Sequence, residues 1–222
     1  MRDRIPEPEL MDTAEQAAAY ADADFAQPHD ALVAMFRERF PGLVSGRLLD
    51  LGCGPADVTV RLAQVLPGVQ VDGVDGAAEM LDRGRERVAA AGLSDRVTLS
   101  RLRLPAPAQH WARQGLYDAV VSTSLLHHLA DPAVLWATID AAARPAAAVF
   151  VWELRRPAST GAARALVDAY SGGEPEVLRT DFFNSLCAAY TVAEVRAQLA
   201  GAGLRLAVEP VGDRHLVAWG HT

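Results

Sequence analysis

The residues best suited to hold a ligand form a glycine turn, Gly52-Cys53-Gly54, directly after the short apolar run 48–51. The run is typical of a strand buried in a parallel sheet, and Pro55 after the turn suits the first position of a helix. Glycines let the backbone approach a ligand closely, and the free N–H groups of a helix start point toward it. The pattern predicts a nucleotide-sized ligand site made of a strand, a turn and a helix.

The same turn lacks two features of phosphate-binding loops. A dinucleotide fingerprint has a third glycine three residues after the second, where this chain has Asp57. A P-loop needs a lysine, and all 21 basic residues of this chain are arginine. An acidic residue in the first turn of a helix would also repel a pyrophosphate. We therefore expect a ligand without phosphate groups, and the missing lysine excludes Schiff-base chemistry.

A second ligand-binding candidate, Asp75, stands at the end of the second predicted strand, 69–74, and 21 residues after the second glycine of the turn. A carboxylate at the end of the second strand of such a sheet can accept hydrogen bonds from both ribose hydroxyls. The alternative is that Asp75 only caps the following helix, predicted over 77–91. Met80 lies early on the inner face of that helix.

Composition limits the class of protein and its partners. With 222 residues, the chain is long enough for one domain that buries about 70–75% of its unfolded surface. A net charge of −7 argues against a nucleic-acid partner. The two cysteines, Cys53 and Cys187, make neither a disulfide framework nor a CxxC metal clip. Without a signal peptide or a long apolar run, we expect a cytoplasmic protein without membrane contact, as a monomer or homodimer.

Residues 1–44 are predicted to form a helical cap in front of the first strand. After a loose arm over 1–10, helices are expected over 13–23 and 30–40, the second with apolar residues at helical spacing. Tyr20, near the end of the first helix, either packs between the helices or closes over the ligand.

Strands alternating with helices predict a parallel, doubly wound α/β sheet, whose ligand lies beyond the carboxyl ends of the strands. Further strands are expected over 96–104, 117–122 and 146–152, with a closing antiparallel hairpin over 204–211 and 215–219. The segment 157–190, with a helix over 161–170, interrupts the alternation. Because it leaves the fifth strand at the ligand edge, we interpret it as a lid.

Three motifs in this order resemble those of class I S-adenosylmethionine-dependent methyltransferases: LLDLGCGPADVTVRLA, VDGVDGAAEML and YDAVVSTSLLHHLADP. The last is similar to the branch that acts on small molecules. The resemblance covers residues 45–155 by motif and the whole chain by layout. It implies a Rossmann-like seven-stranded sheet with an antiparallel last strand, a single domain over 1–222, and S-adenosyl-L-methionine as the cofactor.

The resemblance also implies which residues hold the cofactor. Asp50 would fix the loop and the methionine amine, Asp75 would bind the ribose, and Met80 would pack on adenine. Ser122 would lie near the methionine end. The third strand exits at the adenine side, where the family has an acidic residue and this chain has Arg103. The predicted cofactor site comprises Asp50, Gly52, Cys53, Gly54, Asp75, Gly76, Met80, Leu102, Arg103, Ser122 and Tyr20.

Candidates for a catalytic base follow the fourth and fifth strands. They are His127, His128 and Glu153, since methyl transfer needs a base only when the acceptor carries a proton. Alternatively, the two histidines have only a structural role, and one of the two arginines at 155–156 neutralises the charge of Glu153. Adjacent histidines diverge on most backbones, so no metal site is expected.

The lid segment supplies two further catalytic candidates, Tyr170 and Asn184. Together with Phe182, Phe183 and Tyr190, they would form a wall around the sulfonium, which aromatic faces attract.

The predicted function is methyl transfer from S-adenosylmethionine to a small-molecule acceptor. The main alternative keeps the cofactor but cyclises it, releasing methylthioadenosine and an azetidine carboxylate. A binding protein without turnover stays open too, whereas a nicotinamide dehydrogenase is disfavoured by the missing third glycine.

Overall fold

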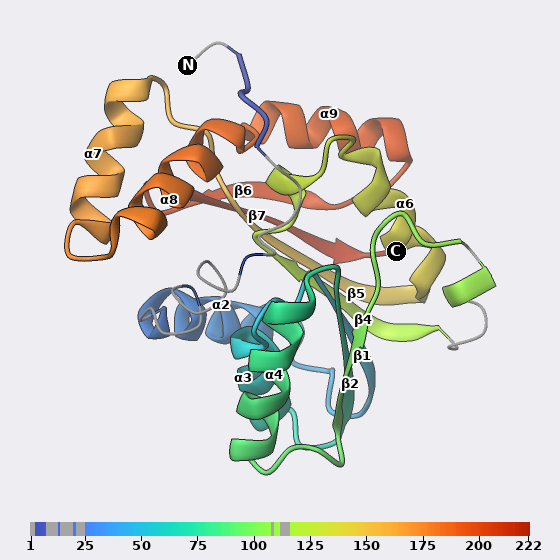
Figure 1. Ribbon diagram of the computed structural model, residues 1–222. Helices are drawn as coiled ribbons and strands as arrows, with labels where there is room; N and C mark the ends of the chain where they lie inside the picture. Colours follow the sequence, from blue (N-terminus) through green and yellow to red (C-terminus); the bar gives the residue numbers. More distant parts are fainter. Residues whose placement is uncertain (1–2, 8–12, 14–19, 21–24, 108, 112–115) are drawn as a thin grey trace.

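The computed structural model describes residues 3–7, 13, 20, 25–107, 109–111 and 116–222. These residues form a central sheet with helices on both faces (Figure 1). The helix expected over 13–23 lies outside the described residues, apart from Thr13 and Tyr20. The second helix of that region, α2 (Ala26–Arg39), begins four residues earlier than the sequence predicted.

The sheet has the strand order β3-β2-β1-β4-β5-β7-β6. Its strands are β1 (Gly46–Leu51), β2 (Val69–Asp75), β3 (Val97–Arg101), β4 (Tyr117–Thr123), β5 (Ala143–Leu154), β6 (Ala207–Val211) and β7 (His215–His221). The first five strands run parallel, and β7 lies antiparallel between β5 and β6. The predicted doubly wound sheet with an antiparallel last strand is confirmed. The direction of winding reverses between β1 and β4, which is where such sheets hold their ligands.

Alternating side chains of the strands build one apolar core on each face of the sheet. On one face Leu48 and Phe150 pack with Phe36 of α2, and this side also carries α3 (Asp57–Val65) and α4 (Ala78–Ala90). On the other face, Leu49 packs with Trp136 of α6 (Ala133–Ala142), beside α9 (Val192–Ala202). A side chain's position in a strand therefore decides which layer it joins.

Residues 157–190 contain two helices, α7 (Thr160–Ser171) and α8 (Glu176–Ala188), lying side by side (Figure 1). The sequence predicted the first of them and missed the second. Pro175 is the residue before α8. The two helices share a small core of their own, with Ala163, Val167 and Leu186 against the end of β5.

Two local predictions are wrong. Pro55 is not the first helical residue, because the turn continues through Ala56 with φ +59° and α3 begins at Asp57. The arm is not loose over residues 3–7: the Ile5 N–H donates to the Cys187 carbonyl over 3.1 Å. Arg4 also reaches the Leu129 carbonyl, which ties this segment to α8 and to the turn after β4.

Candidate functional site

A cavity of about 440 Å³ lies beyond the carboxyl ends of β1, β2 and β4. It falls in the size range of small-molecule sites. A smaller adjoining cavity of about 120 Å³ reaches under the glycine turn. The predicted cofactor residues that line the larger cavity are Tyr20, Gly52, Gly54, Asp75, Gly76, Met80, Leu102 and Arg103, and Asp50 and Cys53 line the smaller one.

The glycine turn is fixed to β2 by its backbone. The N–H groups of Gly52 and Cys53 donate to the Val74 carbonyl over 2.8 and 3.1 Å. Gly52 has φ +71°, and a Cβ there would lie 2.9 Å from the side chain of Leu125. Both the conformation and the close approach require glycine. Burial raises the pKa of the Cys53 thiol, so that it stays protonated and is no nucleophile.

Asp50 lines the smaller cavity and has one carboxylate oxygen without a partner. Its Oδ2 accepts a hydrogen bond of 2.6 Å from Thr59, whereas its buried Oδ1 has no hydrogen-bond partner. Burial raises the pKa of Asp50 to about 6, with a contribution from the charge of Asp75, and the Thr59 hydroxyl opposes the rise. Such a group is suited to a cationic partner, which would satisfy Oδ1 and restore the charged form.

Asp75 joins the glycine turn to the start of α4. Its Oδ2 accepts from the Gly54 N–H and its Oδ1 from the Ala77 N–H, each over 2.8 Å. Capping the start of α4, which the sequence offered as the alternative role of Asp75, is therefore part of what this residue does. The same carboxylate lines the larger cavity, where a carboxylate oxygen can accept hydrogen bonds from hydroxyl groups.

Ser122 is not brought to either cavity. It is fully buried and donates to the Leu51 carbonyl over 3.0 Å. The strand continues one residue further than predicted, and Thr123 lines both cavities in its place, with a buried Oγ1 that has no hydrogen-bond partner. Since successive strand residues face opposite sides, the shift by one residue exchanges the side chain at the site.

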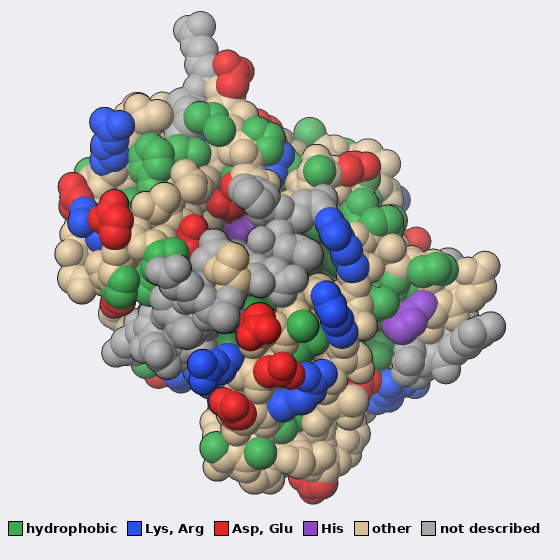
Figure 2. All heavy atoms as spheres, viewed as in Figure 1, with side chains coloured by type: hydrophobic (Ala, Val, Ile, Leu, Met, Phe, Trp, Pro, Cys, Tyr) green, Lys and Arg blue, Asp and Glu red, His purple; other side chains and the backbone are tan. Residues whose placement is uncertain are grey.

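The mouth of the smaller cavity carries an aromatic and charged network. Tyr20 packs on Phe25, with ring centroids 4.8 Å apart, and His29 Nδ1 lies 2.6 Å from a carboxylate oxygen of Asp57. Arg61 binds the same carboxylate over 2.8 Å. Burial would raise the pKa of Asp57, but hydrogen bonds from His29 and Arg61 lower it instead. Figure 2 shows acidic and basic side chains interspersed on the face viewed there.

His127 is held in one orientation by Glu153. Its Nδ1 lies 2.6 Å from Glu153 Oε2, and Glu153 Oε1 accepts from the Leu126 N–H over 2.6 Å. Both side chains are only 2% exposed. His127 lines the larger cavity and Glu153 does not. The prediction of Glu153 as a candidate catalytic base is therefore wrong: both of its oxygens accept hydrogen bonds, it does not line the cavity, and it positions a histidine. The arginines at 155–156 turn elsewhere, to the Asp213 carbonyl and to Glu194.

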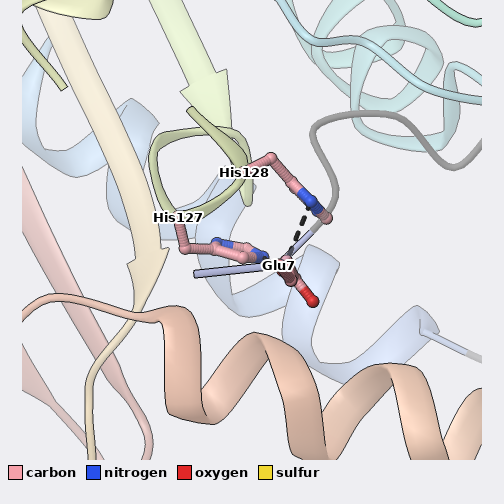
Figure 3. Close-up of side chains that lie close together, drawn as sticks. All are labelled: Glu7, His127 and His128. Carbon is pink, nitrogen blue, oxygen red and sulfur yellow. Dashed lines mark ion pairs between the residues drawn. The ribbon is translucent and has the colours of Figure 1, made fainter. Parts of the chain in front are cut away.

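His128 lies beside His127 and does not diverge from it. The ring centroids are 4.3 Å apart, and both rings approach Glu7 from the N-terminal arm (Figure 3). The expectation that the two imidazoles point apart is wrong because a short 3₁₀ turn, Leu126–His128, places them on one side. The sequence did not predict Glu7 as a site residue, because no local pattern indicates that residue 7 lies against residue 127.

The lid segment faces the cavity with α8. Leu178, Asp181, Phe182 and Ser185 line it, a spacing of three and four residues that marks one helical face. Asn184 is exposed on another face of the same helix, so its predicted place at the site is wrong. Tyr170 does line the cavity, although its hydroxyl donates to Asp213 over 2.7 Å.

The order of the strands and the position of the cavity define a class I methyltransferase fold. A SAM dependent methyltransferase from Aquifex aeolicus has this fold, with a TM-score of 0.67 over 94% of this chain and 98% of that chain, at 18% identity. Residues 49–149 match the family model described as "Methyltransferase domain". The chain therefore has the fold of the class I S-adenosylmethionine-dependent methyltransferases, and its residues 49–149 are similar to their methyltransferase domain.

Two curated relatives are similar over part of their length. Trans-aconitate 2-methyltransferase from Streptomyces coelicolor is 33% identical over 103 residues, which cover 46% of this chain and 31% of that protein. Ubiquinone biosynthesis O-methyltransferase from Pectobacterium atrosepticum is 30% identical over 121 residues, or 54% of this chain and 48% of that protein. The matched region spans less than half of either relative. Among the described helices, none has the length and apolar character needed to cross a membrane.

Proposed function

We propose that the chain binds S-adenosylmethionine, the cofactor of its class, and transfers the methyl group to a small, partly apolar molecule. The observation that carries the proposal is that the glycine turn and the histidine pair line one cavity of about 440 Å³. Cofactor and acceptor would share this volume, so the acceptor must be small. The names of the two relatives, which specify trans-aconitate and a step of ubiquinone biosynthesis, agree with such an acceptor.

The residues present fit the cofactor at each of its parts. The unpartnered Oδ1 of Asp50 would accept from the methionine amine. The carboxylate of Asp75, which lines the larger cavity, would accept from the ribose hydroxyls. Met80 and Leu102 offer apolar surface for adenine, beside Arg103. At Gly54 nothing lies within 4 Å of the position that a Cβ would take, which leaves open space against the backbone.

The chemistry asks little of the protein beyond alignment and, for some acceptors, removal of a proton. S-adenosylmethionine supplies a methyl group that its sulfonium already activates. Trp152, Leu154 and Phe182 give the acceptor part of the cavity apolar walls. Proton removal falls to the buried cluster around His127, whose ring Glu153 holds in place.

Access to the cavity would be controlled by the segments 1–44 and 157–190, acting as cap and lid. Support for the lid comes from the face that α8 turns to the cavity and from the small core that it shares with α7. A pair of helices with its own core can move as a unit. Support for the cap comes from Tyr20 and His29, which line both cavities.

The proposal is tested by calorimetry and product analysis. We expect S-adenosylmethionine to bind and NAD to leave no heat signal. Incubation with small hydroxylated or carboxylated acceptors should yield S-adenosylhomocysteine together with a methylated acceptor. Methylthioadenosine formed without any acceptor would support the cyclising alternative and overturn methyl transfer. Binding of NAD without binding of S-adenosylmethionine would overturn the cofactor assignment as well.

A further inference from the structure

Glu7, His127 and His128 bring three potential metal ligands together at the edge of the larger cavity (Figure 3). Their ligand atoms all lie within 4.8 Å of one another. Glu7 Oε1 is 3.5 Å from His127 Nε2 and 3.3 Å from His128 Nδ1. This oxygen is buried and has no hydrogen-bond partner. Two imidazoles and one carboxylate form a donor set suited to divalent transition metals.

The separations are those of ligands around an ion. A hydrogen bond between a charged imidazole and a carboxylate is shorter, about 2.7–2.9 Å between heavy atoms. Two ligands at about 2.1 Å from one tetrahedral ion stand roughly 3.4 Å apart. The two separations from Glu7 Oε1, of 3.3 and 3.5 Å, bracket this value.

Glu153 prepares His127 for this role. An ionised carboxylate only accepts hydrogen bonds, so the bond of 2.6 Å places a hydrogen on His127 Nδ1. The other ring nitrogen, Nε2, is then turned toward Glu7. A carboxylate behind a ligating histidine fixes its orientation and raises its basicity, which is a recurring arrangement in metal sites.

The surrounding contacts keep the arm in position. Ser185 of α8 donates to Glu7 Oε2 over 3.3 Å. The positive charge nearest in sequence, Arg4, donates to backbone carbonyls, including that of His127 over 2.6 Å, and stacks on the Tyr190 ring. The carboxylate of Glu7 therefore faces the histidines, and no arginine among the described residues forms an ion pair with it.

We propose that Glu7, His127 and His128 bind one divalent transition-metal ion, whose remaining coordination position faces the acceptor part of the cavity. Three protein ligands with an open position are typical of catalytic metal sites, and both histidines line the cavity. The inference rests on the proposed function in one respect. An ion there would lower the pKa of an acceptor hydroxyl, so that its proton passes to solvent water without a strong base; His127 then serves as a ligand and no longer as the base.

The test uses the full chain after removal of metals with a chelator. Titration with Co²⁺ should produce the visible absorption of four- or five-coordinate cobalt, saturating at one ion per chain, and calorimetry with Zn²⁺ should give the same stoichiometry. Glu7→Gln removes a ligand from the arm without touching the core, and it should weaken binding at least tenfold. Glu153→Gln, which acts through His127, should weaken binding about 10- to 100-fold.

Two control variants separate the site from general electrostatics. Glu174→Gln removes the same charge from the same cavity, and His221→Gln removes an exposed imidazole elsewhere. Both should bind the ion as the original chain does. A chain that gives no cobalt spectrum, or that binds equally well after Glu7→Gln, would overturn the proposal and indicate a proton shared among the three side chains.

The same samples distinguish failure of this inference from failure of the proposed function. Binding of S-adenosylmethionine is measured on the metal-free chain, because none of the proposed cofactor residues is a proposed ligand. Cofactor binding without ion binding overturns only the metal site. Ion binding without cofactor binding supports the metal site and overturns the cofactor assignment.

Discussion

Asp50 and Thr123 line the same small cavity, and each has a buried oxygen without a hydrogen-bond partner, Oδ1 and Oγ1. They come from the neighbouring strands β1 and β4, which pair Asp50 with Val121. An unsatisfied buried oxygen costs free energy, about 1–3 kcal/mol. Two of them on residues that line one cavity fit the cofactor site that we propose there.

Replacing Asp50 tests this relationship directly. Asp50→Asn keeps the shape but removes the charge, and a hydrogen bond to a charged group contributes about 1.5–3 kcal/mol. We expect calorimetry to show S-adenosylmethionine binding weakened roughly 10- to 100-fold, with thermal stability at pH 8 unchanged or improved. Unchanged affinity would show that the amine binds elsewhere.

The raised pKa of Asp50 predicts a pH dependence with a definite sign. Burial lifts the pKa from an ordinary 3.8 to about 6, so the folded chain gains stability as pH falls from about 6 toward 4. Cofactor binding needs the ionised form, and it should weaken about tenfold for each pH unit below 6.

The neighbour of Asp50 supplies the matched variant for this pH dependence. Thr59→Val removes the hydrogen bond that stabilises the carboxylate, and it should move the binding midpoint to higher pH. Asp50→Asn should flatten the profile. A midpoint that stays in place in the Thr59→Val chain would assign the dependence to another group.

Two adjacent hydroxyls give a matched test of the strand end. Thr123→Val should weaken cofactor binding several-fold, because Thr123 lines the cavity and its Oγ1 has no hydrogen-bond partner. Ser122→Ala should leave binding within about twofold and lower stability by about 1 kcal/mol, since its hydroxyl bonds the Leu51 carbonyl. Chemical denaturation measures the second effect. The reverse outcome would restore Ser122 as the cofactor residue.

Two residues of α8 test the lid in the same way. Phe182→Ala removes an apolar wall and should raise the acceptor KM about tenfold. Asn184→Ala alters an exposed side chain. It should leave KM unchanged and should change the free energy of unfolding by no more than about 0.5 kcal/mol. Steady-state kinetics decide between them, and equal effects of both substitutions would contradict a lid whose inner face carries Phe182.

The sheet and most of the cofactor site follow from local sequence order. A strand, the turn at Gly52 and Gly54, and a carboxylate at the end of the next strand are neighbours along the chain as well as in space. The same stretch of sequence predicts a ligand without phosphate groups, because Asp57 stands where a dinucleotide-binding loop has a glycine and the chain contains no lysine.

The remaining site residues depend on information that the local pattern lacks. One residue more in β4 exchanges Ser122 for Thr123 at the cavity, since strand side chains alternate. The side chains that α8 turns to the cavity can be predicted only once the helix itself is predicted. The same helix places Asn184 on another, exposed face. Glu7 meets His127 across about half of the chain, a contact that no spacing rule predicts.

One aromatic side chain gives the molecule an optical reporter. Of the four tryptophans, Trp152 lines the larger cavity, Trp111 and Trp136 lie in the core on the other face of the sheet, and Trp219 stacks under Arg39. Indole emission responds to local polarity, so ligand entry should alter the fluorescence of Trp152 and leave the other three nearly constant. Binding of a molecule in the acceptor part of the cavity can therefore be followed by tryptophan fluorescence, without a label and before any product is known.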